Sequence, residues 1–101
     1  MKIINDNLVK YKSQRYSGVV TELNDKFIKI ENILAYGESG IVLQEQIFKI
    51  GKALKQYIEV ERINLGNRVE FYASVGLIES GNEKQYFLNR IRQIEIYSIL
   101  Y

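Results

Sequence analysis

Residues 68–77 read Arg-Val-Glu-Phe-Tyr-Ala-Ser-Val-Gly-Leu, and this stretch decides the fold class of the chain. The positions between its apolar residues are mostly polar or small. This alternation has the period of two that sends successive side chains to opposite faces of a β-strand. The stretch therefore predicts a half-buried strand. The side chains expected in its core are Val69, Phe71, Ala73, Val75 and Leu77.

A β-hairpin is predicted nearer the N-terminus. Residues 11–23 contain the run Ser-Gly-Val-Val-Thr, and β-branched residues favour strands. Gly18, in the middle of this segment, predicts a bulge or a sharp bend. An Asn-Asp turn at 24–25 then leads into a second strand over residues 26–36.

Residues 41–60 fit two descriptions. The apolar residues at 41, 43 and 47 are spaced as in a strand, whereas the larger apolar set of the segment also recurs at helical spacing. That larger set is Leu43, Ile47, Ile50, Leu54 and Ile58. We predict a third strand near 41–48 and a helix near 49–60, with a single helix over 41–60 as the alternative.

The last segment, residues 84–101, alternates like a strand but changes phase once. Ile91 is out of step with the other apolar residues, and a bulge near 89–90 would restore the phase. Residues 97–101 are mostly apolar, which is typical of a tail that packs on its own domain or on a partner. The in-phase residues are Tyr86, Leu88, Ile94 and Ile96.

The predicted order is strand, strand, strand, short helix, strand, strand. In this order the chain resembles the OB-fold. Residues 65–75 resemble the strand of small prokaryotic OB barrels in which a glycine turn precedes V-x-F-x-A-x-V. Residues 86–90, Tyr-Phe-Leu-Asn-Arg, resemble the Tyr-x-Leu-x-Arg of their final strand. The resemblance covers most of residues 14–97. It implies a mainly β, five-stranded OB-like Greek-key barrel with one short helix between strands 3 and 4.

Length and composition indicate one domain over residues 1–101. Residues 1–10 fit a mobile arm, a short helix or an extra strand. The polar N-terminus and the lack of any apolar run of membrane-spanning length predict a cytoplasmic protein with no membrane partner. Abundant Ile, Asn, Lys and Tyr without Pro are typical of AT-rich genomes, including those of phages and plasmids.

The sequence lacks the residues that carry most catalysis. It has no histidine and no cysteine, which removes the usual acid/base group, the Ser-His triads and thiolate metal sites. No phosphate-binding glycine motif or metal motif is present. We expect a non-catalytic protein without a metal or a cofactor.

The distribution of charge and aromatic residues predicts a binding surface. Residues 1–30 carry six bases against three acids, and the chain has eight Tyr and four Phe. Proteins that bind single strands combine a basic groove with aromatic platforms for the bases. In an OB barrel the outer side of the second and third strands binds oligonucleotides. The candidate contact residues are Lys12, Arg15, Tyr16, Lys26, Phe27, Lys29, Arg68, Tyr72, Arg90 and Arg92.

Two functions follow from these observations. The first is a nucleic-acid-binding accessory protein that binds single-stranded DNA or RNA. The alternative is a small protein-interaction module, an adaptor or inhibitor of phage or plasmid type, that docks on a larger partner. It could also form a homodimer through an edge strand or through the apolar C-terminal tail.

Overall fold

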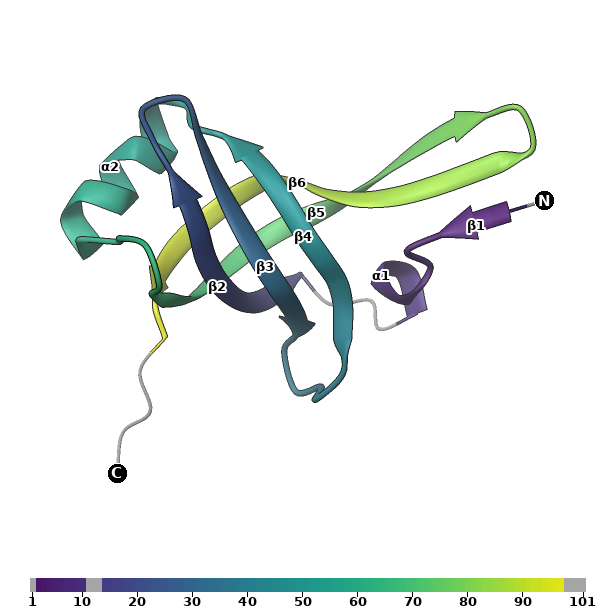
Figure 1. The fold of residues 1–101 in the computed structure, drawn as a ribbon, viewed down its shortest axis with the longest axis horizontal. Helices are drawn as coiled ribbons and strands as arrows, with labels where there is room; N and C mark the ends of the chain where they lie inside the picture. The colour runs from purple at the N-terminus through teal and green to yellow at the C-terminus, as the bar shows by residue number, and fades with distance from the viewer. Residues whose placement is uncertain (1, 11–13, 98–101) are drawn as a thin grey trace.

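The computed structural model describes residues 2–10 and 14–97 (Figure 1). Residues 41–60 divide into a strand and a helix, which confirms the split prediction over the single helix. Residues 2–10 supply both a strand and a short helix. The elements are β1 (Lys2–Ile4), α1 (Asn7–Lys10), β2 (Arg15–Leu23), β3 (Phe27–Ala35), β4 (Ile41–Lys49), α2 (Lys52–Glu61), β5 (Arg68–Ser80) and β6 (Glu83–Ile96).

All strands of the described chain belong to one curled sheet, in the order β1-β6-β5-β2-β3-β4. The prediction of a mainly β, barrel-like fold with a short helix is confirmed. The sheet has six strands where five were predicted, because β1 adds to β6 in parallel. The other neighbouring pairs are antiparallel. β4 and β6, both described throughout, share no backbone pairing, so the half-barrel remains open between them.

One predicted bulge is present where it was expected, on β6, whereas the bulge expected at Gly18 lies on the partner strand. The pairs Ser17–Leu34 and Val19–Glu31 set two steps of β2 against three of β3, so the extra residue is on β3, at 32–33. Between the pairs Tyr72–Arg92 and Ser74–Asn89, β5 advances by two residues and β6 by three. This difference places a bulge on β6 at residues 90–91. A bulge bends its strand and increases the local twist, which a sheet needs in order to curl.

Gly18 lets two strands approach closely. A Cβ atom on this residue would lie 2.5 Å from Ile30 Cγ2 and 2.9 Å from the backbone oxygen of Glu31. Both distances are shorter than ordinary van der Waals contact. The glycine is therefore required by the packing of β2 against β3.

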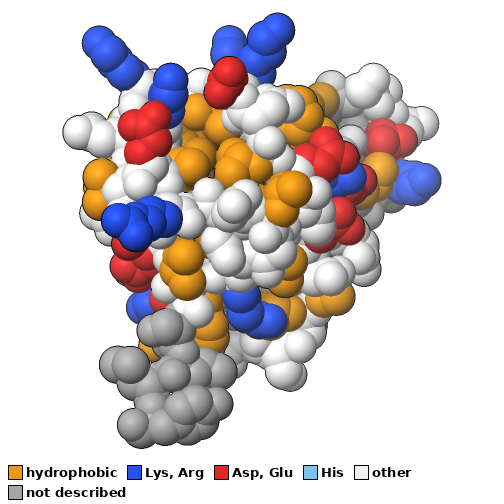
Figure 2. All heavy atoms as spheres, turned by 60° about the vertical axis from the view of Figure 1, so that its left-hand side comes forward, with side chains coloured by type: hydrophobic (Ala, Val, Ile, Leu, Met, Phe, Trp, Pro, Cys, Tyr) orange, Lys and Arg blue, Asp and Glu red, His pale blue; other side chains and the backbone are white. Residues whose placement is uncertain are grey.

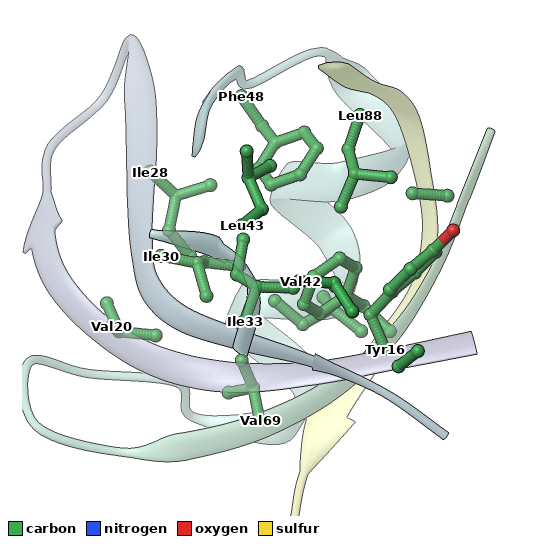
Figure 3. Packing of buried hydrophobic residues seen from close by; sticks show 14 of the residues in the cluster. Tyr16, Val20, Ile28, Ile30, Ile33, Val42, Leu43, Phe48, Val69 and Leu88 are labelled. Carbon is green, nitrogen blue, oxygen red and sulfur yellow. The ribbon is translucent and has the colours of Figure 1, made fainter. Parts of the chain in front are cut away.

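The core lies inside the curve of the sheet (Figure 3), and its largest fully buried side chains come from β2, β3, β5, β6 and α1. Val69, Phe71 and Ala73 are fully buried, as predicted from the alternation in this stretch. Val75 and Leu77 were also predicted to be core, and this is wrong: they are 38% and 44% exposed. The reason is that the β5–β6 hairpin extends past the barrel (Figure 1).

The projecting part of this hairpin, residues 75–87, is called the hairpin arm. Gly76 and Phe87 are paired across it, and a Cβ on Gly76 would lie 2.5 Å from the Phe87 ring. An aromatic ring lying over a cross-strand glycine shields the backbone that the glycine leaves bare. β1 pairs with the arm through residues 83–85, and the Asn5 side chain donates to the Tyr86 carbonyl at 3.1 Å.

The two helices lie on β6 at different positions. α2 packs on β6 and buries Leu54. Ile63, which lies two residues beyond the end of α2, is also buried. α1 packs against both β4 and β6 and buries Leu8. Neither helix is long and apolar enough to cross a membrane.

Candidate functional site

The predicted nucleic-acid residues do not form one continuous surface. Figure 2 shows Lys and Arg side chains as separate groups with acidic and hydrophobic side chains between them. Lys12 lies outside the described residues. The other nine are distributed over the core, an acidic cluster, one face of the sheet and one end of the gap between β4 and β6.

Lys29 lies in the acidic cluster on the outer face of β3 and β4. Its Nζ is 2.8 Å from Glu45 Oε2, and Glu22 and Glu31 are 3.8 and 3.9 Å away. The hydrogen bond to Glu45 is the main cause that raises the pKa of Lys29 above 10.5. One base among three acids gives this face a negative character, which repels a phosphate backbone.

The raised pKa of Lys29 predicts an alkaline loss of stability. The folded state retains the proton at pH values where the unfolded chain loses it, so this contribution is complete below pH 10.5 and disappears as the pH rises through the folded-state pKa. Urea denaturation measures the free energy of unfolding at pH about 9 and about 11. Between these two pH values, Lys29→Met should lose less of it than the unmodified chain does. Lys55→Met is the control on an exposed helix position, and an equal loss in both variants would contradict the assignment.

Tyr16 was predicted to lie on an exposed strand face, and this is wrong. Its side chain is only 1% exposed, and its ring stacks on Phe71 with centroids 5.9 Å apart. On β2, Tyr16 and Val20 face inward, whereas Val19 and Thr21 face outward, so this candidate residue lies on the inner side of the sheet.

Arg15, Tyr72 and Arg92 occupy neighbouring positions across β2, β5 and β6. Directly opposed residues of antiparallel strands share a face. The Arg15 guanidinium carbon lies 4.5 Å from the ring centroid of Tyr36 and 5.9 Å from that of Tyr72. We call these four residues the arginine–tyrosine row. Arg68 is the first residue of β5, and its guanidinium carbon lies 5.3 Å from the ring centroid of Tyr97.

Arg15 is not available as an unpaired cation. Its Nη2 donates to Glu70 Oε2 at 2.6 Å, and this hydrogen bond is the main cause that raises the pKa of Arg15. Glu95 lies opposite Glu70 on β6. Acids thus offset part of the positive charge of this face.

The gap between β4 and β6 is hollowed by two cavities, and we call it the open seam. A cavity of about 480 Å³ extends from β4 and β6 to the start of α2. A second cavity, of about 370 Å³, lies between β4 and the hairpin arm. Both are lined by Gln46, Ile47 and Phe87, so together they form one groove along the seam. Ile47 is 55% exposed.

The Gln46 side chain bridges the open seam where the two cavities meet. Its Oε1 accepts a hydrogen bond from the backbone N–H of Leu88 on β6 at 3.1 Å. Its Nε2 donates to the backbone oxygen of Ile47 on β4 at 3.2 Å. One side-chain amide therefore satisfies a backbone donor on one wall and a backbone acceptor on the other.

Basic residues gather at the α2 end of the open seam. Lys49, Lys52 and Arg90 line the larger cavity, and none of them forms an ion pair with a described residue. Lys26 and Phe27 lie beside them, because Phe27 pairs with Lys49 and the Ile50 N–H donates to the Lys26 carbonyl. We call Lys49, Lys52 and Arg90 the basic cluster.

The structure thus joins three predicted residues, Lys26, Phe27 and Arg90, with functional candidates that the sequence did not single out. Those are Gln46, Ile47, Lys49, Lys52 and Phe87. Their sequence signal is weak, because each is an ordinary residue of a strand or a helix start. They became a group only through the pairing of distant strands.

Across residues 2–10 and 14–97, no group of three acidic side chains is arranged to bind a metal ion. In comparisons with known proteins, no family model, curated protein or solved structure significantly matches the chain.

Proposed function

We propose that this chain is a non-catalytic protein-docking module that binds a partner along the open seam. The observation that carries the proposal is the groove between two strands whose facing backbone edges are not paired with each other. Unpaired edges are ready templates for another strand, and proteins use them to bind extended segments. The exposed side chain of Ile47 adds apolar surface for that contact.

We also propose that the barrel is of the OB type. The order β6-β5-β2-β3-β4, with α2 between β4 and β5, supports this assignment, since the OB-fold is a partly open five-stranded Greek-key barrel. β3 and β4 would then be the strands whose outer side takes an oligonucleotide in that fold. The three glutamates around Lys29 favour a protein partner over a nucleic acid on that side.

Single-strand nucleic-acid binding is the second candidate function, and one specific observation favours it. The arginine–tyrosine row places cations and aromatic rings alternately across three strands, and Tyr36 is 64% exposed. Bases stack on such rings while arginines contact phosphates. Glu70 and Glu95 on the same face oppose it, which is why we rank it second.

A selection from a displayed library of random peptides tests the docking function. We expect binders that lose at least about tenfold in affinity when Ile47→Lys puts a charge into the open seam. Val60→Lys is the matched control, because Val60 is 73% exposed on α2 and does not line the seam. Affinities are measured by fluorescence anisotropy.

Two outcomes would reject the docking function. One is a library that yields no binder to the immobilised chain. The other is a set of binders that responds equally to Ile47→Lys and Val60→Lys. Salt-sensitive binding of oligo(dT) that is abolished by Tyr36→Ala with Arg92→Gln would support the nucleic-acid function instead.

A further inference from the structure

We infer that the open seam is an insertion slot for an extended, acidic segment of a partner protein, which lies between β4 and β6 as an additional strand. This inference rests on the proposed docking function and specifies its ligand. The segment has apolar side chains toward the hairpin arm and carboxylates toward the basic cluster.

Gln46 indicates that the slot accepts a peptide backbone. A peptide group has one N–H donor and one C=O acceptor, and a strand placed between two others turns them alternately to each side. The Gln46 amide makes this pair of contacts, with Leu88 N–H on one wall and the Ile47 oxygen on the other. It occupies the position of one peptide group of the missing strand.

The chemistry of the two walls favours a peptide over a nucleic acid. Both strand edges present N–H donors and C=O acceptors in alternation. A phosphate backbone offers only acceptors, so it would leave the carbonyls of the slot unpaired and facing negative charge. A peptide backbone can pair with both kinds of group.

The charges along the slot give the segment its direction. The end next to α2 carries the basic cluster, which has no acidic partner among the described residues. The other end is lined by Ile47, Ile78 and Phe87, and its one charged side chain among the described residues, Glu45, is paired with Lys29. An acidic end of the segment is therefore attracted to the α2 end and has no such attraction at the arm.

Insertion must displace the Gln46 side chain. Strands in a sheet lie about 4.8 Å apart, so two strands that hold a third between them lie about 9.6 Å apart. Cα atoms of β4 and β6 approach to within 8 Å, so insertion must also move these two strands apart. The bridge therefore opposes binding, because the segment has to replace the two hydrogen bonds that the Gln46 side chain makes. Removing it should increase the affinity for a segment that supplies its own peptide groups.

Fluorescein-labelled synthetic peptides of about eight residues test the inference, since this is a common strand length. Each peptide alternates Val and Thr and ends in three Glu, three Gln or three Lys. We expect the Glu peptide to bind about tenfold more tightly than the Gln peptide, and the Lys peptide to bind most weakly. N-methylation of alternate amides should abolish binding of the Glu peptide, because it removes strand pairing.

Variants of the slot supply independent readouts. Lys49→Glu with Lys52→Glu should remove the preference for Glu, and Lys2→Glu with Lys55→Glu is the control of equal charge change away from the slot. Gln46→Ala should bind the Glu peptide about two- to tenfold more tightly, because a net hydrogen bond is no longer lost on insertion. Thermal melts of each variant confirm folding.

The outcomes separate this inference from the docking function on which it rests. Equal binding of the Glu and Gln peptides, with library binders still sensitive to Ile47→Lys, overturns the acidic ligand and leaves docking intact. Weaker binding by Gln46→Ala, or undiminished binding of the N-methylated peptide, overturns insertion. Displacement of the Glu peptide by oligo(dT) of about 12 nucleotides, lost in Lys49→Glu with Lys52→Glu, would assign the slot to nucleic acid.

Discussion

Gly18→Val should lower the free energy of unfolding by about 3 kcal/mol and the melting temperature by roughly 15 °C. The added side chain would begin with a Cβ atom 2.5 Å from Ile30 and 2.9 Å from the backbone oxygen of Glu31. The Ile30 side chain is fully buried and cannot easily rotate away, and the backbone oxygen belongs to a paired strand. β2 and β3 must therefore separate at the bulge.

Gly40→Val is the matched control for this substitution. No atom lies within 4 Å of the position that its Cβ would take, so a change of about 0.5 kcal/mol or less is expected. Urea denaturation and thermal melts followed by circular dichroism measure both variants. Similar stabilities of the two variants would show that β2 and β3 do not approach as closely as described.

Tyr16→Ala should lower the free energy of unfolding by about 3–5 kcal/mol, the usual range for removal of a large buried aromatic ring. The ring is nearly fully buried and stacks on Phe71, which in turn makes an edge contact with Phe48. Its removal leaves a void between three strands of the barrel. The loss is a large part of the 5–15 kcal/mol that stabilises a typical domain.

Tyr36→Ala is the control for Tyr16→Ala, because Tyr36 is exposed and contributes chiefly its contact with Arg15. We expect it to lower the free energy of unfolding by about 1 kcal/mol or less. A Tyr16→Ala protein that melts like Tyr36→Ala would place the Tyr16 ring outside the core and restore it as a candidate binding residue.

Sequence patterns were sufficient for the features that depend on local chemistry. The alternation over 68–77 predicted β5. The phase change at Ile91 predicted the bulge of β6. Each of these signals lies within a few residues of the feature that it predicts.

The burial of residues near the end of the β5–β6 hairpin could not be predicted in this way, because it depends on how far the hairpin extends beyond the barrel. Val75 and Leu77 continue the alternation of Val69 and Phe71 without a change, yet they lie beyond the barrel. Alternation reports which side of a strand a residue occupies and carries no information on where the core ends. Tyr16 was placed outside for a different reason: a tyrosine fits either face of a strand, so the residue type did not indicate which face is inward.

The candidate site was least predictable, because its residues meet through strands that are distant in sequence. Gln46 contacts Leu88 across a separation of 42 residues. Lys49 and Lys52 gain a possible role only because Arg90 on β6 faces them across the cavity. Lys29 was predicted as a phosphate contact from its neighbours Lys26 and Phe27, whereas its partner Glu45 comes from the next strand.

The pairing of β1 with the hairpin arm has a consequence for how the chain is assembled on the ribosome. The partners of Lys2–Ile4, residues 83–85, are synthesised about 80 residues after it. During that interval β1 has no strand edge to pair with, and Ile3 remains exposed to solvent. Contacts of such sequence separation form late and slow folding. β1 is therefore made before the other described strands of the sheet and is among the last of them to be paired.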